Sequence, residues 1–222
     1  RMLPPKGMYN GLSIDYLYES SESLSGDFFD VFKIDEKNTG VYICDVVGHG
    51  VSASLLTVFV RQSLRTIAKD GMGLNKIMKE LHKTFLSLNL DYDKYFSVFM
   101  GIYNKDTHDF GYVNAGHNSE PILLRKNKDI ALLNSKGYPI ANIFDDVNYD
   151  ENKLNLDIGD KLFLYTDGIT EAKNQHNEQF GVENLIDIIK KGGDELNNLK
   201  HSLDDFCKLH KDDYAMLMAE II

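Results

Sequence analysis

The chain lacks the features that mark several large classes of proteins. Its 222 residues include two cysteines, Cys44 and Cys207, and no CxxC pair, which argues against a disulfide framework and a cysteine-based zinc site. No Lys/Arg cluster is longer than two residues, and 34 acids against 24 bases give a net charge of -10. Nucleic acids and anionic membranes are bound by concentrated positive charge, so neither is expected as a partner.

Long apolar runs and secretion signals are also missing. No apolar run approaches the roughly 18 residues that a membrane helix needs, and the opening RMLPPKGMYNG has no apolar stretch typical of a signal peptide. So few cysteines are typical of a reducing compartment. We therefore expect a cytoplasmic protein whose domain makes no membrane contact.

The length and the start of the chain bear on its domain organisation. An apolar content of 43% and a charged content of 26% are ordinary for a globular protein, and a chain of this length can bury a sizeable core. The sequence starts on Arg1 and runs directly into Pro4 and Pro5, which suggests that a neighbouring upstream domain is missing. We expect residues 1–10 to be a linker from that domain and residues 11–222 to form one folded domain.

Two kinds of hydrophobic periodicity alternate along the chain. Helical spacing follows Gly50 to about Lys69 and recurs over 74–88, 181–191 and 195–210. Segments rich in aromatic and β-branched residues predict strands over 13–18, 27–34, 40–47, 95–103, 109–116, 121–126, 130–134, 161–166 and 213–222. This order does not fit a doubly wound parallel sheet. We expect an α+β fold in which two antiparallel β-sheets pack face to face with helices on the outer faces, a four-layer αββα sandwich.

An aspartate ends the apolar segment GVYICDVV. Strand alternation puts Val41, Ile43 and Asp45 on one face, which should be buried. A bare carboxylate in such a place is costly unless it is protonated, paired or bound to a metal ion. No basic residue lies nearby in the sequence, so Asp45 needs an explanation.

Other acids occupy similar positions at strand ends. Asp27 begins a strand that the polar turn DEKNTG pairs with the strand of Asp45, Asp167 follows KLFLYT, and Asp212 precedes the closing strand. Oxygen ligands without clustered histidine or cysteine favour Mg²⁺ or Mn²⁺, and two such ions would lower the pKa of a shared water and clamp a phosphoryl oxygen. Each feature alone also fits a turn or a structural acid, so the residues by themselves leave both interpretations open.

Several segments occur in the order and spacing of a known family. They are SGDFFD (25–30), DVVGHGVSAS (45–54), YVNAGHNSEPILL (112–124), LYTDGITEAKN (164–174) and DDYAML (212–217). Together they resemble the PPM-type, protein phosphatase 2C-like family, specifically its bacterial SpoIIE/RsbU-like branch, over nearly the whole chain. The resemblance implies a two-sheet sandwich with two Mn²⁺ or Mg²⁺ ions at one end of the sheets.

The resemblance also implies the ligands and the chemistry. Asp27 and Asp45 would bridge the two ions, the backbone carbonyl of Val46 would bind one of them, and Asp167 and Asp212 would complete the set. These four aspartates would act in catalysis through water held by the metals. The implied enzyme is a metal-dependent phosphoserine/phosphothreonine protein phosphatase, a hydrolase of phosphoric monoesters that attacks with a metal-bridging hydroxide.

In this branch the usual substrate is a phosphorylated anti-sigma factor antagonist, a small STAS-type domain, so that the enzyme contributes to sigma factor regulation and signal transduction. A sensor or receiver domain often lies upstream. The sequence leaves the oligomeric state open, a homodimer included. The alternative function is a docking module of the same fold with weak or no catalysis, and a metal-dependent nuclease is disfavoured because a basic groove is lacking.

Four further residues have both a functional and a structural interpretation. Asp30 and Asp213 fall on the opposite strand faces from Asp27 and Asp212, which favours supporting positions behind the metal ligands or a purely structural role. Asn114 and His117 in the loop NAGHN are candidate catalytic residues. His117 could protonate the leaving oxygen or orient a water, but a hydrogen bond that stabilises the loop explains it equally well.

Two positions depart from the family pattern. Ser25 stands where glycine is common, and Ala215 stands where a threonine is usual, which removes a hydroxyl close to the metal acid Asp212. No basic residue is assigned to the substrate phosphate, because the arginines are scattered along the chain.

Overall fold

The computed structural model describes residues 3–20, 25–48, 50–207 and 213–222. The strands in these residues form two sheets, and every strand pair is antiparallel. The spatial order in the first sheet is β1 (Gly7–Tyr9), β2 (Leu12–Glu19), β12 (Tyr214–Ile221), β11 (Lys161–Tyr165), β7 (Ile122–Leu124) and β8 (Ile130–Leu132). The order in the second is β10 (Asn152–Asn155), β6 (Asp109–Ala115), β5 (Tyr95–Asn104), β4 (Asn38–Val46) and β3 (Asp27–Lys33), and β9 (Ile140–Ala141) pairs with β5.

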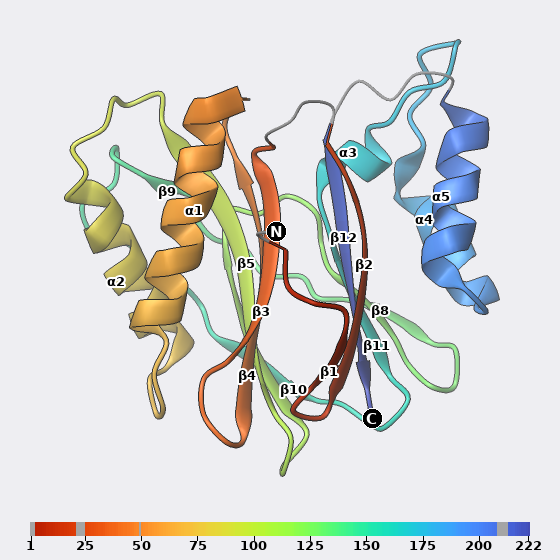
Figure 1. The fold of residues 1–222 in the computed structure, drawn as a ribbon, viewed down its shortest axis with the longest axis horizontal. Helices are drawn as coiled ribbons and strands as arrows, with labels where there is room; N and C mark the ends of the chain where they lie inside the picture. Colours follow the sequence, from red (N-terminus) through yellow and green to blue (C-terminus); the bar gives the residue numbers. More distant parts are fainter. Residues whose placement is uncertain (1–2, 21–24, 49, 208–212) are drawn as a thin grey trace.

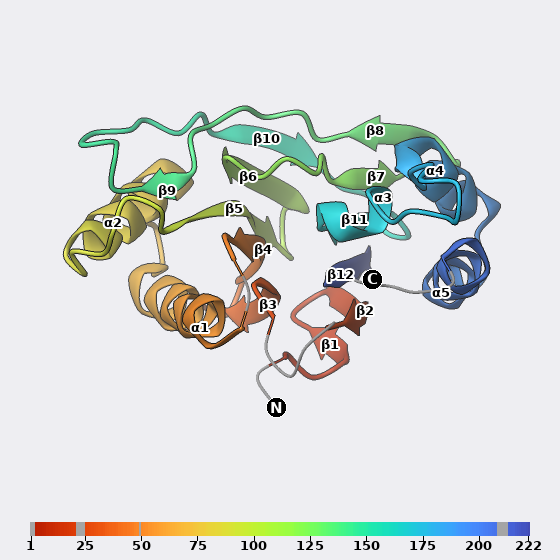
Figure 2. The same cartoon turned by 90° about the horizontal axis from the view of Figure 1, so that it is seen from above.

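Helices cover the outer faces of both sheets. The helices α1 (Gly50–Ile67) and α2 (Leu74–Leu86) pack on the second sheet, and α4 (Gly181–Lys191) and α5 (Glu195–Phe206) pack on the first. A short helix, α3 (Asp167–Thr170), follows β11 directly. Figures 1 and 2 show the resulting four layers. The expected αββα sandwich is confirmed.

Alternation along β3 and β4 determines what each side chain meets. Phe29 and Val31 of β3 and Val41 and Ile43 of β4 lie in the apolar core between the two sheets. The alternate residues of β4 lie under α1 and α2 instead. Both faces of these strands are therefore buried, which explains their nearly continuous apolar sequence. The face that carries Asp45 is the one between the sheets, as the alternation predicts.

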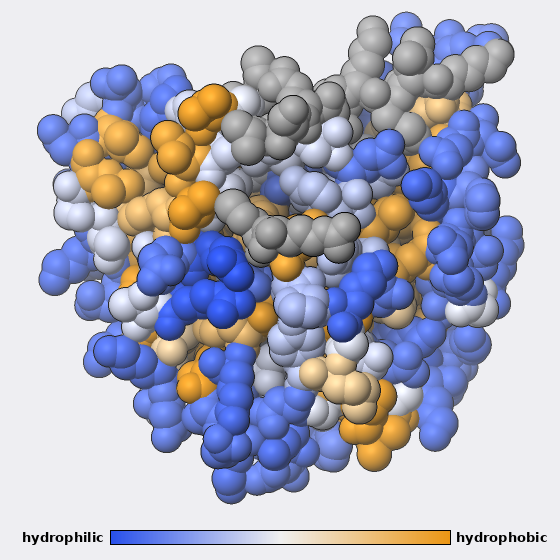
Figure 3. All heavy atoms as spheres, viewed as in Figure 1, coloured by the Kyte–Doolittle hydropathy of each residue, from blue (hydrophilic) through white to orange (hydrophobic). Residues whose placement is uncertain are grey.

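The turn from β4 into α1 requires glycine. Gly48 and Gly50 have φ angles of 89° and 75°, in the left-handed region that side chains disfavour. The helix that follows buries one face against the sheet and exposes three apolar side chains, Val51, Leu55 and Val58, on its other face. Figure 3 shows apolar residues over this part of α1. Among the described residues, no helix has both the length and the apolar character needed to cross a bilayer.

Several short elements carry little sequence signal. β1 lies within the range 1–10 that was expected as a linker, and it pairs with β2. β10 has the polar sequence NKLN and joins the sheet as an edge strand beside β6. Asp167, expected at a strand end, begins α3. The helix expected over 195–210 is described as far as Phe206. These elements depend on their neighbours in space more than on their own periodicity.

Candidate metal centre and adjoining cleft

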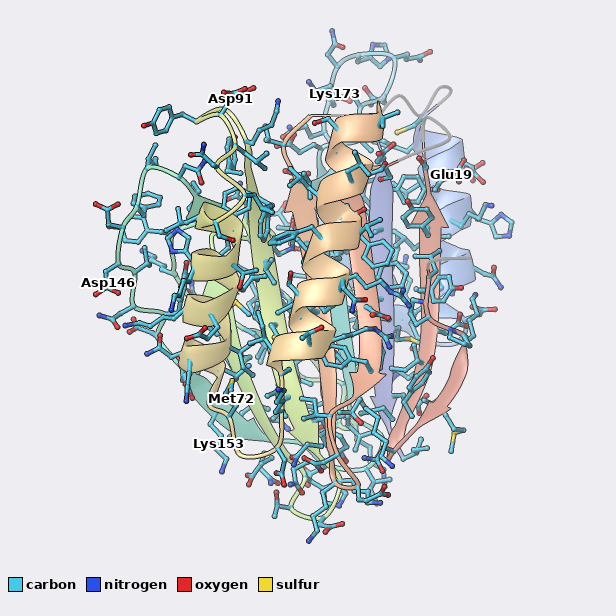
Figure 4. All side chains as sticks on the ribbon, turned by 60° about the vertical axis from the view of Figure 1, so that its left-hand side comes forward. Glu19, Met72, Asp91, Asp146, Lys153 and Lys173 are labelled. Atoms are coloured by element: carbon cyan, nitrogen blue, oxygen red, sulfur yellow. The ribbon has the colours of Figure 1, made fainter. Side chains whose placement is uncertain are left out.

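Four acidic positions lie at one end of the sandwich. Asp27 begins β3, Asp45 lies near the end of β4, Asp167 follows β11, and Asp213 precedes β12. Antiparallel pairing brings the start of β3 to the end of β4 in one sheet and the end of β11 to the start of β12 in the other. A hydrogen bond between Thr166 and Asp27 joins the two pairs across the sheets. Figure 4 shows Lys173, which follows α3, at this end of the molecule and Lys153 of β10 at the opposite end.

Two of the expected metal ligands face each other directly. Asp27 and Asp45 are register partners in the β3–β4 pair, and directly opposed residues have Cβ atoms about 4.5–5.5 Å apart. Neither carboxylate forms an ion pair with a Lys, Arg or His in the part of the chain that the structure describes. Two carboxyl groups therefore meet at the end of the inter-sheet core, and no ion pair among the described residues offsets a charge on either of them.

The pKa values of both acids reflect this crowding. Burial raises the pKa of Asp27 well above its usual value, and the charge of Asp45 raises it further. Burial and the nearby charges of Asp167 and Asp213 raise the pKa of Asp45 to about 6, although its hydrogen bond with Asp27 opposes the rise. Both causes disfavour the charged form of a carboxyl group. A cation at this place would relieve them.

Close backbone contacts hold the surrounding segments. A Cβ atom on Gly26 would lie 2.6 Å from the carbonyl oxygen of Val46, and one on Gly168 would collide with the carbonyl oxygen of Asp213. Only glycine allows such approaches. The start of β3 thus lies against the Val46 carbonyl, and α3 lies against the residue that precedes β12. Asp212 lies outside the described residues.

Thr166 connects Asp27 to the other sheet. Its hydroxyl donates to Oδ2 of Asp27 at 2.6 Å and accepts from the N–H of Ala215 at 3.0 Å. Sequence reasoning missed this residue. Its signal was a threonine at the end of the apolar run KLFLY, directly before an expected metal ligand.

Both departures from the family pattern have contacts here. The hydroxyl of Ser25 accepts from the N–H of Asp27 at 3.0 Å, so this side chain supports the start of β3. Ala215 has no hydroxyl, but its backbone N–H holds the hydroxyl of Thr166, which in turn bonds to Asp27. Thr166 therefore supplies a hydroxyl next to the expected metal ligands Asp27 and Asp167, although the usual threonine at position 215 is missing.

A cleft of about 810 Å³ opens beside the acids. Asp45 and Asp167 line it together with residues 46–48. The remaining polar lining comes from β5, β6 and the loops after β6 and β8, namely Ser97, Asn114, His117, Asn118, Glu120, Asn134 and Ser135. Lys136 is the one Lys or Arg side chain among the described residues that line this cleft. It is exposed. Sequence reasoning assigned no basic residue to the substrate and did not consider Lys136, which belongs to a loop without any recognisable pattern.

His117 is hydrogen-bonded at both ring nitrogens. Nε2 lies 2.9 Å from the carbonyl oxygen of Tyr165, and Nδ1 lies 3.3 Å from the hydroxyl of Ser97. Since a carbonyl only accepts, Nε2 must donate, and Nδ1 accepts from Ser97. Burial lowers the pKa of His117. A neutral ring whose proton is already bonded favours the loop-stabilising interpretation over a proton donor.

Asn114 fixes two walls of the cleft. Its Nδ2 donates to the carbonyl oxygens of His117 and Ser135, at 2.9 and 2.8 Å, and its Oδ1 accepts from the N–H of His117 at 2.7 Å. These bonds use most of its hydrogen-bonding capacity. Asn114 therefore holds the loops around the cleft in place.

Asp30 is separate from the other acids. Its fully buried carboxylate accepts from Arg65, whose Nε is 2.6 Å and Nη2 2.9 Å away, and from Nε of Arg61 at 3.2 Å. Both arginines belong to α1, on the opposite face of the sheet from Asp27. The structural interpretation of Asp30 is the one that these contacts favour.

The donor chemistry at the acidic end fits a hard divalent cation. The acidic side chains at this end offer only oxygen atoms, which are the ligands that Mg²⁺ and Mn²⁺ prefer. Two of these carboxyl groups, those of Asp27 and Asp45, have raised pKa values and lie opposite each other. Within the described ranges no group of three His, Cys, Asp or Glu side chains forms a complete metal site. The set expected from the sequence also includes Asp212, which falls outside those ranges.

Comparison with known sequences gives one family and several relatives. The profile of Stage II sporulation protein E (SpoIIE) matches residues 35–222. Phosphoserine phosphatase RsbU of Bacillus subtilis (strain 168) is 26% identical over 214 residues, which are 93% of this chain and 62% of RsbU. Phosphoserine phosphatase RsbP of the same organism is 31% identical over 163 residues, 72% of this chain and 40% of RsbP. The chain thus spans less than two thirds of either relative.

Solved structures share the fold. One is the PP2C phosphatase domain of SpoIIE from Bacillus subtilis, solved with a fragment of its regulatory domain, at a TM-score of 0.80 and 18% identity. The alignment covers 98% of this chain and 64% of the SpoIIE chain. Another is the catalytic domain of the serine/threonine protein phosphatase PstP in complex with two manganese ions, at a TM-score of 0.68 and 13% identity. The alignment covers 95% of this chain and 98% of the PstP chain. At such identities the likeness establishes the fold alone.

Proposed function

The chain belongs to the SpoIIE family, and from this premise we propose that it is a metal-dependent phosphoserine/phosphothreonine protein phosphatase. The observation that carries the proposal is the opposed pair of Asp27 and Asp45, which lacks a cationic partner among the described residues and adjoins an open polar cleft. A stable fold gains nothing from two repelling carboxylates, so a bound cation is the simplest reason for them. The phosphoserine phosphatase names of RsbU and RsbP support the activity.

Two Mn²⁺ or Mg²⁺ ions would be held by Asp27, Asp45, the Val46 carbonyl, Asp167 and Asp212. When bound, such ions offset the carboxylate charges, lower the pKa of water and polarise a phosphoryl oxygen. The chain itself binds and orients. Asn114 and His117 keep the loops of the cleft in place through the bonds described above.

The cleft bears on the substrate. Its polar lining and open form suit an extended segment that carries a phosphorylated side chain. Lys136 offers a positive charge to an incoming phosphate dianion, which the acids Asp45, Asp167 and Glu120 would otherwise repel. We include in the proposal a phosphorylated anti-sigma factor antagonist with a STAS-type domain as the substrate protein, and a sensor or receiver domain upstream of this one in the full-length chain.

The test compares hydrolysis of a phosphoserine peptide and of p-nitrophenyl phosphate with Mn²⁺ and with EDTA. We expect turnover with Mn²⁺, loss of turnover in EDTA, and a decrease of at least about 100-fold in Asp45→Asn. The matched control is Asp109→Asn, which removes an acid that pairs with Lys153 at the opposite end of the sandwich and should stay within about 2-fold of wild type.

Turnover that needs no metal and survives Asp45→Asn would reject this mechanism. Partner binding without turnover on any phosphoprotein would favour the docking module instead.

A further inference from the structure

The hydrogen bonds of Thr166 have a defined direction. The N–H of Ala215 can only donate, so the Thr166 oxygen accepts at that contact. A hydroxyl has one proton, and the 2.6 Å contact to Asp27 Oδ2 is where it lies. This length lies within the normal range of an O–H donor to an oxygen acceptor. The chain of bonds therefore runs from the β12 backbone through Thr166 to Asp27.

This chain of bonds is shielded from solvent. Thr166 is fully buried and Asp27 is 6% exposed, so water cannot readily replace the hydroxyl. One carboxylate oxygen of Asp27 is thus held by a partner from the opposite sheet, which restricts how the carboxylate can rotate about its bond to Cβ.

Thr166 also joins the segments that carry the other expected ligands. Its own N–H donates to the carbonyl oxygen of Ala215 at 3.0 Å, so backbone and side chain both bond to the start of β12. Asp167 is the next residue in the chain, and Asp213 and the expected ligand Asp212 lie just before Ala215. One side chain therefore sets the position of β3 relative to the ends of β11 and β12.

We propose that Thr166 is a positioning residue whose hydroxyl holds Asp27 in the orientation that divalent-cation binding requires. The proposal rests on the proposed function, since it assumes that Asp27 binds a cation. A merely structural hydroxyl would contribute to stability alone. A positioning hydroxyl should also change metal affinity, as the partners of metal ligands do by roughly 10–100-fold.

The experiment measures Mn²⁺ affinity by calorimetric titration of the metal-free protein, together with its unfolding temperature. We expect Thr166→Val, which keeps the shape and removes the hydroxyl, to weaken Mn²⁺ binding by about 10-fold or more. Thr166→Ser, which keeps the hydroxyl, should restore the affinity to within about 3-fold of wild type. Should Thr166→Val not fold, Thr166→Ser and Thr166→Ala provide the same comparison, because they differ by one oxygen atom.

The control is Thr57→Val. Thr57 is also buried, and its hydroxyl donates to a backbone carbonyl within α1 at 2.8 Å, so its loss should lower the unfolding temperature and leave Mn²⁺ affinity unchanged. Equal affinities in wild type, Thr166→Val and Thr166→Ala would overturn the role of Thr166 and leave the phosphatase proposal standing. A wild-type protein that binds no Mn²⁺ would overturn both.

Discussion

The strand β3 carries two buried aspartates whose surroundings have opposite charge. Asp30 faces α1 and bonds to Arg61 and Arg65. Asp27 faces the end of the inter-sheet core, where its neighbours are Asp45 and the hydroxyl of Thr166. One carboxylate is neutralised by the protein itself, whereas no ion pair within the described ranges neutralises the other.

This difference shows what kind of buried acid indicates function. Burying a carboxylate is costly, and a good ion pair offsets much of that cost. Asp30 is then explained completely by its contacts. Asp27 remains costly as it stands, and a cost that persists within a folded protein is a reason to look for a ligand.

The largest expected effect comes from removing the charge partner of Asp30. Arg65→Met should lower the free energy of unfolding by about 3–4 kcal/mol, because it leaves a fully buried carboxylate with one weaker partner. Urea unfolding measures it. The exposed pair of Lys33 and Glu36 is the control, and Lys33→Met should leave the urea unfolding midpoint nearly unchanged. A loss below about 1 kcal/mol in Arg65→Met would remove the contrast between the two aspartates.

The next effect is the pH dependence of the free energy of unfolding of the metal-free protein, measured in EDTA. The pKa of Asp45 in the folded protein is about 6, against a usual value of 3.8, so the folded state binds the proton more tightly. The stability that this provides is present below about pH 4 and is lost as the pH rises through about 6, by about 2–3 kcal/mol.

Asp45→Asn removes this loss. The variant should therefore be more stable than wild type at pH 7.5 without metal, and the two should approach each other near pH 4. Urea unfolding across this range gives the comparison. Parallel pH profiles for the two proteins would mean that Asp45 is not under electrostatic strain.

The smallest expected effect concerns the cation that lies on the wall of the cleft. Lys136→Ala should raise KM for a phosphoserine peptide by about 2–5-fold and leave kcat nearly unchanged, because an exposed charge attracts the substrate without touching the acids. Lys136→Arg keeps the positive charge, so its KM should stay close to that of the wild type. Steady-state kinetics at two salt concentrations measure both.

Lys126→Ala is the matched control for this variant, since Lys126 lines a cleft at the other end of the sandwich. Equal kinetics in Lys136→Ala and Lys126→Ala would contradict a role of Lys136 in substrate attraction.

Local pattern was sufficient for much of the acidic end. Alternation predicted the face of Asp27 and of Asp45, and the short turn between their strands predicted that they pair, which the register confirms. The helices α1, α2 and α4 also follow their apolar spacing closely. Short edge elements such as β10 were missed, because a polar strand is held by its neighbour and has no apolar alternation of its own.

Contacts between distant parts of the chain were beyond local pattern. The bonds of Asp30 to α1, of Thr166 to Asp27 and of His117 to Tyr165 each join segments whose separation in sequence carries no periodic signal. For this reason strand alternation predicted which face of β3 carries Asp30 but could not predict that arginines of α1 bind it. Lys136 likewise became visible only once its loop was placed beside the cleft.

The sequence by itself determined which residues are apolar, where the longer strands and helices run, and which carboxylates lie near strand ends, because backbone geometry turns spacing directly into a face. Only the tertiary structure decided which carboxylate meets an arginine, which meets a hydroxyl, and which meets another carboxylate. That choice depends on how two sheets and a helix layer pack against one another, and packing is a property of all the buried side chains together.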